Sequence, residues 1–342
     1  MTPVTHLIDL PTPLEVGDLP RWSTDPATLR DAVHRLTADV DWAGLTWPQL
    51  LDALARRGAT DIGWSRLAEG HADAVRVLAQ AGRTPEPGAL YGVWASRSRG
   101  SGPVARPVPG GWEVSGELRF ASGVGVLDRA LVTAVDAEGT HRLLDLPVAG
   151  WEGAPASWPV TAMATSRSWT VPVRTTCAAS AEVGAPGWYL ARPAFLPGGV
   201  GVAAVWWGAT VRVAREAGRF GAGAPPSPER ARRHGLVRTE LVAAGAVLQE
   251  AGRRLEELMP PGSMGEWDAL GAGTREALAG LSQEVRAVVA SAGTRVLGHV
   301  RVLGGAVGLA QDEDLARSVA DLEVYLAQHP ADRAAVGLGQ PA

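Results

Sequence analysis

The chain has 342 residues, of which 46% are hydrophobic and 20% charged, so it can form a globular protein with a substantial core. Its formal net charge of −4 argues against nucleic acid as a partner, because phosphate binding requires a dense cluster of cations. All 32 basic residues are arginine, and the absence of lysine excludes enzymes that need a Schiff-base, pyridoxal-phosphate or P-loop lysine.

The single cysteine, Cys177, excludes a disulfide framework and a cysteine-based metal site, and we expect no metal. The sequence contains no run of 18 apolar residues, and its N-terminal residues lack the basic and apolar regions of a signal peptide. We therefore expect a cytoplasmic protein that does not contact a membrane.

The first part of the chain, residues 1–84, has a helical period and is predicted to be an N-terminal helical domain. Asp25 and Pro26 are typical of an N-cap followed by proline in the first turn, and apolar residues then recur at steps of three and four from Leu29 onward. We expect helices from residue 26 to about 40, over 48–55 and over 62–81.

The middle part, residues 85–197, loses the helical period. Glycine and proline become frequent, and short runs alternate between apolar and polar residues, as at Trp112 and Val114 and again at Val171 and Val173. This pattern predicts a middle antiparallel β domain, folded as a sandwich or a barrel.

The last part, residues 198–342, is predicted to be a C-terminal four-helix bundle. Apolar residues from Val237 to Leu258 alternate steps of four and three, as in a bundle seam, so we expect Leu248 and Leu281 to be buried. The helices are expected to break at residues 260–262 and 304–305 and to end at Pro330. The predicted fold class is therefore α+β, with a helical domain, a β domain and a helical bundle in that order.

This order of domains resembles the acyl-CoA dehydrogenase superfamily, and three segments carry the resemblance. Residues 111–123 read GWEVSGELRFASG and are similar to a segment of the family's middle domain, with Arg119 in place of the usual lysine. Residues 302–306 are similar to the family's Gly-Gly turn. Residues 320–326 are similar to a helix that carries an Arg-Asp pair in the family, with Ala320 in place of the arginine.

The resemblance implies an oxidoreductase that uses FAD on the CH–CH bond of an acyl thioester such as an acyl-CoA. It also implies a homodimer or homotetramer and a possible electron-transfer or reductase partner. By position in the family pattern, the residues expected to bind the cofactor are Trp94, Ser96, Phe120, Ala121, Ser122, Arg215, Arg219, Gly304 and Gly305.

The family position that often carries the catalytic carboxylate falls on Gln328 and His329 in this sequence. Monooxygenases of the same fold have a histidine in this neighbourhood, which His329 resembles, so His329 is the candidate catalytic residue; the alternative is a histidine that only favours the helix C-terminus. Five bundle carboxylates are other candidate bases: Glu216, Glu240, Glu256, Glu257 and Glu284. Three functions therefore stay open: a dehydrogenase, a flavin-dependent monooxygenase, or a non-catalytic member that serves as a hetero-oligomer partner or binding protein.

Overall fold

The computed structural model describes residues 6–97, 100, 102–225, 227–259 and 270–339. Its N-terminal helices are α1 (Pro26–Thr37), α2 (Trp47–Thr60) and α3 (Ile62–Gln80). Each begins at a side chain that accepts a hydrogen bond from the first turn: Asp25, Thr46 and Asp61. These caps satisfy N–H groups that a helix leaves free, so the helix starts are encoded locally. α2 continues beyond its expected end at residue 55.

The middle part forms one six-stranded sheet in the order β1-β4-β2-β3-β6, with β5 paired to β4. The strands are β1 (Tyr91–Trp94), β2 (Val104–Val108), β3 (Gly111–Ala121), β4 (Arg129–Val135), β5 (His141–Pro147) and β6 (Trp169–Ala178). β4 pairs antiparallel with β5, as expected, but it runs parallel to both β1 and β2, where the expected antiparallel pairing is wrong. Alternation of side chains is the same in both kinds of pairing, so the sequence pattern does not reveal strand direction.

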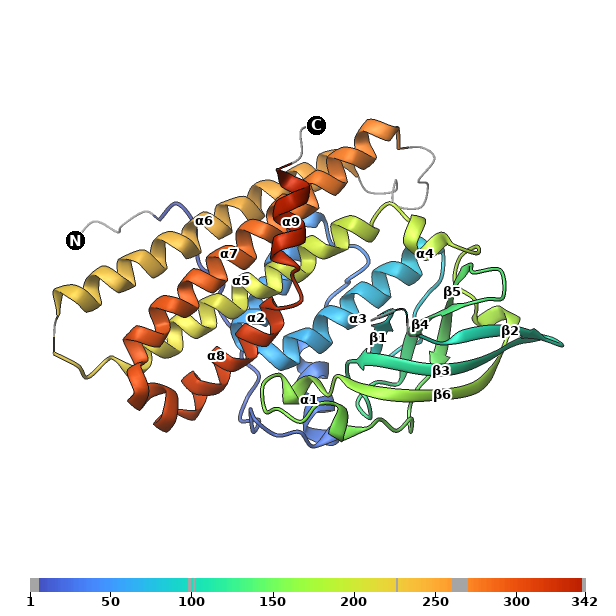
Figure 1. Ribbon diagram of the computed structural model, residues 1–342, viewed down its shortest axis with the longest axis horizontal. Coiled ribbons are helices and arrows are strands. Elements are labelled where there is room, and N and C mark those ends of the chain that lie inside the picture. Colours follow the sequence, from blue (N-terminus) through green and yellow to red (C-terminus); the bar gives the residue numbers. More distant parts are fainter. Residues whose placement is uncertain (1–5, 98–99, 101, 226, 260–269, 340–342) are drawn as a thin grey trace.

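Helices follow the sheet: α4 (Trp188–Ala191), α5 (Phe195–Phe220), α6 (Pro228–Leu258), α7 (Ala272–Gln311), α8 (Glu313–Leu326) and α9 (Ala331–Leu338). α5 to α8 pack as a bundle beside the sheet (Figure 1). The expected break at 260–262 lies outside the described residues. The expected break at Gly304 and Gly305 is present, because Gly305 has non-helical backbone angles (φ +58°, ψ −167°) that divide α7 into two helical segments, the second of which ends at Gln311. α9 adds a helix beyond Pro330, where the last helix was expected to end.

The bundle seam is partly as predicted, because Leu248 is buried while Leu281 is only half-buried. α2 and α5 cross in direct backbone contact at two glycines. A Cβ atom on Gly58 would lie 2.3 Å from the Val205 carbonyl oxygen, and one on Gly208 would lie 1.9 Å from the Ala55 carbonyl oxygen. Within the described part of the chain, no helix has both the length and the apolar character that a membrane span requires.

α3 lies between the bundle and the sheet and joins their cores (Figure 1). It contributes to all three apolar clusters of the described core: Ile62, Ala72 and Val75 to the bundle cluster, Trp64, Leu67 and Ala68 to the cluster with α1 and the sheet, and Ala74, Val77 and Leu78 to the cluster beneath β1, β4 and β5. A helix that buries apolar residues on so many sides is fixed firmly, and the polar residues that remain on it are held in place.

Candidate functional site

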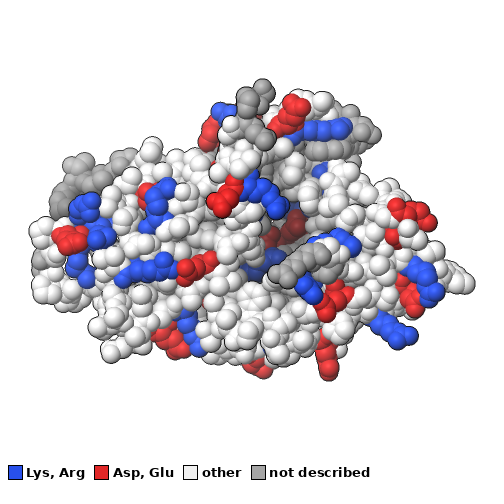
Figure 2. All heavy atoms as spheres, in the orientation of Figure 1, with Lys and Arg blue, Asp and Glu red and all other residues white. Residues whose placement is uncertain are grey.

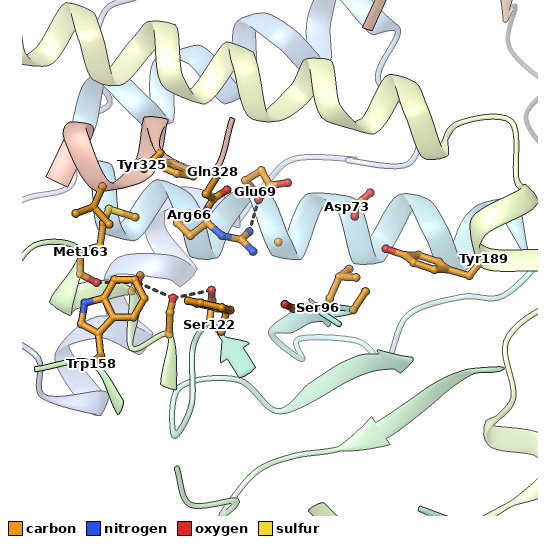
Figure 3. Close-up of a pocket in the computed structure, with 18 residues that line it drawn as sticks. Arg66, Glu69, Asp73, Ser96, Ser122, Trp158, Met163, Tyr189, Tyr325 and Gln328 are labelled. Atoms are coloured by element: carbon orange, nitrogen blue, oxygen red, sulfur yellow. Dashed lines mark hydrogen bonds and ion pairs between the residues drawn. The ribbon is translucent and has the colours of Figure 1, made fainter. Parts of the chain in front are cut away.

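A cavity of about 660 Å³ lies where α3, the sheet and the end of α8 meet. Figure 2 shows the molecule hollowed between its helical part and the sheet, with acidic and basic side chains inside the hollow. Figure 3 shows α3 along one side of the cavity, strand and loop residues opposite it, and α8 at one end. Cavities of this size bind small molecules and cofactors, so this is the candidate functional site.

Four residues of α3 line the cavity: Arg66, Glu69, Gly70 and Asp73. They recur at steps of three and four, which places them on one face of the helix. The Nη1 group of Arg66 donates a hydrogen bond to the Glu69 carboxylate (Figure 3). Burial raises the pKa of Glu69, and the charge of Arg66 only partly opposes this rise. The carboxylate of Asp73 lies 3.6 Å from the guanidinium of Arg192.

A chain of three serine hydroxyls lines the side formed by the sheet. The hydroxyl oxygens of Ser122 and Ser168 are 2.8 Å apart, as are those of Ser168 and Ser166. Ser166 donates to the Met163 carbonyl oxygen at 2.7 Å, so Ser168 must donate to Ser166, and Ser122 to Ser168. The Ser122 hydroxyl thus donates its hydrogen to Ser168. The Ser122 oxygen can therefore only accept a hydrogen bond from a ligand N–H.

The backbone around these serines is strained. In the described chain, positive φ angles outside glycine occur at Asp39, Phe120, Met163 and Arg167, and the last three adjoin the serine chain. Phe120 is 53% exposed and meets Trp158 edge-to-face, with ring centroids 6.2 Å apart. Both rings line the cavity. Strain of this kind persists only where surrounding contacts hold it, and it concentrates at functional sites.

α8 holds the strained turn through Asp321. The Asp321 carboxylate accepts a hydrogen bond from the Met163 N–H at 2.5 Å. Burial raises the pKa of Asp321 to about 7, the Met163 bond opposes the rise, and the nearby carboxyl of Asp61 adds to it. The buried guanidinium of Arg212 acts on both acids and also donates to Ser318 and to the Thr60 carbonyl oxygen.

The end of α8 closes the cavity with Tyr325 and Gln328 (Figure 3). Tyr325 is fully buried, and its hydroxyl has no hydrogen-bond partner among the described residues. Burial raises the pKa of this hydroxyl, so it stays protonated. His329, the expected catalytic residue, is absent from the cavity lining and lies beside Trp206, with ring centroids 6.2 Å apart. Burial and the charge of Arg286 lower the pKa of His329.

The structure brings some of the expected cofactor-binding residues together at the cavity. Ser96, Phe120 and Ser122 line it. Trp94 lies behind them and donates its indole N–H to the Ser122 carbonyl oxygen at 2.8 Å, while Ala121 is buried in the core of the sheet.

The other expected cofactor-binding residues do not line the cavity. Arg215 donates to the Pro11 carbonyl oxygen at 3.3 Å, and Arg219 pairs with Glu216 and Asp312. Gly304 and Gly305 lie at the kink of α7, where Leu315 packs against Gly304. The bundle carboxylates named as candidate bases are also missing from the lining: Glu216, Glu240, Glu256, Glu257 and Glu284.

The sequence analysis missed the charged residues of α3. A usable signal was present, because Arg66, Glu69 and Asp73 interrupt an otherwise buried helix at helical spacing. Charged side chains that recur on one face of a buried helix are costly unless a cavity or a ligand meets them.

No family profile matches the sequence, and no curated protein matches it. Solved structures nevertheless share its fold. Dibenzothiophene monooxygenase TdsC from Paenibacillus sp. A11-2, in complex with FMN and indole, has a TM-score of 0.77 at 18% identity, over 92% of this chain and 89% of that chain.

Two further structures agree. Methanesulfinate monooxygenase MsuC from Pseudomonas fluorescens has a TM-score of 0.74 at 16% identity, over 92% of this chain and 88% of that one. Nitrososynthase from Micromonospora carbonacea var. africana has a TM-score of 0.71 at 17% identity, over 94% of this chain and 86% of that one. The chain therefore has the acyl-CoA dehydrogenase fold that its sequence resembles.

Proposed function

We propose that this protein is a flavin-dependent monooxygenase, one of the three functions that the sequence leaves open. The observation that carries the proposal is the set of side chains that the end of α8 and the turn after it present to the cavity: Val324, Tyr325, Ala327 and Gln328. None of them removes a proton from carbon near neutral pH, because burial raises the pKa of Tyr325 and the others do not titrate. Dehydrogenation of an acyl thioester needs such a base, whereas oxygen transfer does not. The names of two similar structures, both monooxygenases, support the same choice.

The residues of the cavity fit a flavin. The Ser122 oxygen can accept from a ring N–H, the indole of Trp158 offers an aromatic surface, and Arg66 offers donors to ring oxygens. A second hollow of about 420 Å³ adjoins the cavity beyond Phe120 and Trp158. Arg119 lines it together with Glu117, whose carboxylate accepts a hydrogen bond from Arg119 Nε at 2.8 Å, so the other guanidinium N–H groups of Arg119 are the donors offered to a phosphate. When bound, a reduced flavin supplies the electrons that activate dioxygen. Crystal structures of similar proteins contain FMN or FADH2.

The protein's own residues would hold and enclose the reactants. Trp158 and Met163 present apolar surface, which excludes water from the ligands. The serine chain, fixed at the Met163 turn by Asp321, orients the ring that it binds. We also propose that a separate reductase supplies the reduced flavin, because the sequence has no G-x-G-x-x-G motif for a nicotinamide cofactor.

One observation favours acyl thioester dehydrogenation as a second candidate function. Glu69 lines the cavity, and burial raises the pKa of its carboxyl, which makes its carboxylate a stronger base. The ion pair with Arg66 works against this role, because it stabilises the carboxylate.

Two measurements separate these functions. In the first, the protein is given FMN reduced by a separate reductase, labelled dioxygen, and indole, dibenzothiophene or methanesulfinate as a substrate. We expect one labelled oxygen atom in the product, and Glu69→Gln should retain this activity. In the second, oxidised flavoprotein is mixed anaerobically with acyl-CoA thioesters, and its visible absorption should not change. Bleaching that Glu69→Gln abolishes would instead establish the dehydrogenase. Failure to bind FMN or FAD would favour the non-catalytic function.

A further inference from the structure

Two hydrogen-bond donors meet at the end of the cavity next to α8. The Tyr325 hydroxyl is fully buried and has no partner in the described structure, although a buried hydroxyl normally has one. Arg66 uses one of its five N–H groups on Glu69, its hydrogen-bond partner among the described residues. Its side chain is 21% exposed, and in Figure 3 the guanidinium points into the cavity.

The charged groups around these donors do not balance. Among the described residues, the guanidinium groups of Arg66, Arg192 and Arg286 surround the carboxylates of Glu69 and Asp73. Arg76 also acts on Asp73 but is matched by Glu256. The cluster therefore carries one excess positive charge, and protonation of Glu69 would increase the excess. An uncompensated charge in a buried region is costly, so a ligand of opposite charge is favoured there.

We propose that the Arg66 guanidinium and the Tyr325 hydroxyl bind an anionic oxygen that accepts a hydrogen bond from each of them. This inference rests on the proposed function in one respect: the oxygen belongs either to an acidic substrate, such as a carboxylate or sulfinate, or to the pyrimidine ring of a reduced flavin. The chemistry is the same in both cases, because an anionic acceptor satisfies the unused donors and neutralises the excess charge.

Tyr325→Phe is the sharpest test, because it removes one oxygen atom that has no hydrogen bond to any described protein group. We expect the variant without ligand to unfold at a higher temperature than the parent, since the lost hydroxyl is buried and unpaired. We also expect its affinity for benzoate, used as an anionic probe and measured by calorimetry, to fall at least about tenfold.

Tyr91→Phe is the matched control. Tyr91 is equally buried, but its hydroxyl accepts a hydrogen bond from the Glu86 N–H at 3.0 Å. Its removal should lower the unfolding temperature and leave benzoate affinity unchanged. Benzylamine is the control probe, and it should bind more weakly than benzoate to the parent protein, because the excess charge is positive.

The second variant, Arg66→Gln, separates the two sources of the anionic oxygen. If the substrate supplies it, benzoate affinity falls and the reduction potential of bound FMN is unchanged. If the reduced flavin supplies it, removal of the cation lowers that potential, and benzoate affinity differs between the parent and the variant only in the flavin-free protein, where the donors are not in use. Arg66→Lys keeps the positive charge, so it should retain most of the parental benzoate affinity and most of the parental FMN potential. This result would show that the loss in Arg66→Gln comes from the missing charge and not from a change in structure.

The proposal is overturned if Tyr325→Phe and Arg66→Gln both leave benzoate affinity and flavin potential at parental values, or if benzylamine binds as tightly as benzoate. These outcomes differ from failure of the proposed function. A protein that binds benzoate through Tyr325 but binds no flavin would disprove the monooxygenase and leave this inference intact.

Discussion

The α2–α5 crossing and the cavity are both bordered by α3, yet they are built in opposite ways. At the crossing, Gly58 and Gly208 bring two helix backbones together with no space left. At the cavity, the Tyr325 hydroxyl lacks a partner, carboxylates have raised pKa values, and Phe120 and Met163 have strained backbones.

The difference shows that the crossing stabilises the fold, whereas the cavity destabilises it in the absence of a ligand. Close packing at the crossing is favourable without any ligand, because dispersion and burial act within the protein itself. The unsatisfied groups of the cavity cost stability until a ligand meets them. Substitutions in the two regions should therefore have opposite consequences for folding and for binding.

The largest effect is expected at the crossing. Gly208→Ala places a methyl group 1.9 Å from the Ala55 carbonyl oxygen, so the two helices must separate. We expect a loss of about 4 kcal/mol or more in the free energy of unfolding, measured with urea. Gly218→Ala on the same helix meets no atom within 4 Å and should stabilise by about 0.5–1 kcal/mol. Similar values for both variants would contradict the close crossing.

A second large effect is expected in the bundle seam. Leu248 is 3% exposed, so Leu248→Ala should lower the free energy of unfolding by roughly 2–5 kcal/mol through lost burial and a new cavity. Leu281 is only half-buried, and Leu281→Ala should cost less than half as much. Equal losses of unfolding free energy in parallel urea titrations would show that the difference in burial does not determine the cost of these two substitutions.

Asp321 holds the strained turn at Met163, and its effect on stability should depend on pH. It titrates near 3.8 in the unfolded chain and near 7 in the fold. Between these values the unfolded chain loses a proton that the folded protein keeps, so a rise in pH from about 4 to 7 lowers stability. Asp321→Asn abolishes this titration and can still accept from the Met163 N–H. We expect it to match the parent near pH 4 and to exceed its stability at pH 8 by roughly 4 kcal/mol.

Two comparisons complete the test of Asp321. Asp321→Ala loses the acceptor for the buried Met163 N–H, so it should be less stable than Asp321→Asn at every pH, by about 1–3 kcal/mol. A stability curve for Asp321→Asn that runs parallel to the parental curve from pH 4 to 8 would mean that another group, such as Asp61, accounts for the pH dependence.

The features that the sequence predicted are those encoded by neighbouring residues. The helix starts at Asp25 and Asp61 depend on a cap within the same turn, and Leu248 belongs to a seam that repeats along one helix. The direction of β4 depends on the crossover connections between strands, and the alternation of side chains does not encode those connections.

The site was only partly predictable for a related reason. His329 was named by its resemblance to a histidine of monooxygenases, but α8 ends at Leu326 and the chain then turns, which puts His329 beside Trp206 of the bundle and outside the cavity lining. Ser96, Phe120 and Ser122 were found by family position. Tyr325 and the charged face of α3 are site residues only because they line the cavity. The cavity forms when segments that are distant in the sequence meet, so the sequence did not identify these residues.

The smallest effect tests whether strain at the cavity serves binding. Phe120 has φ +58°, which favours glycine, and its ring lies at the cavity against Trp158. Phe120→Gly should therefore stabilise the ligand-free protein by about 1 kcal/mol, because it relieves the strained backbone. It should also weaken FMN binding roughly threefold to tenfold, because an aromatic contact is lost.

Asp39→Gly is the control variant. It relieves the same φ of +58° away from the cavity, so it should stabilise the protein similarly and leave FMN affinity unchanged. Thermal unfolding and FMN fluorescence titration measure both quantities. If Phe120→Gly left both the stability of the ligand-free protein and the affinity for FMN unchanged, the strain at this position would have no connection with the ligand, and the contrast between the two regions would rest on the polar groups alone.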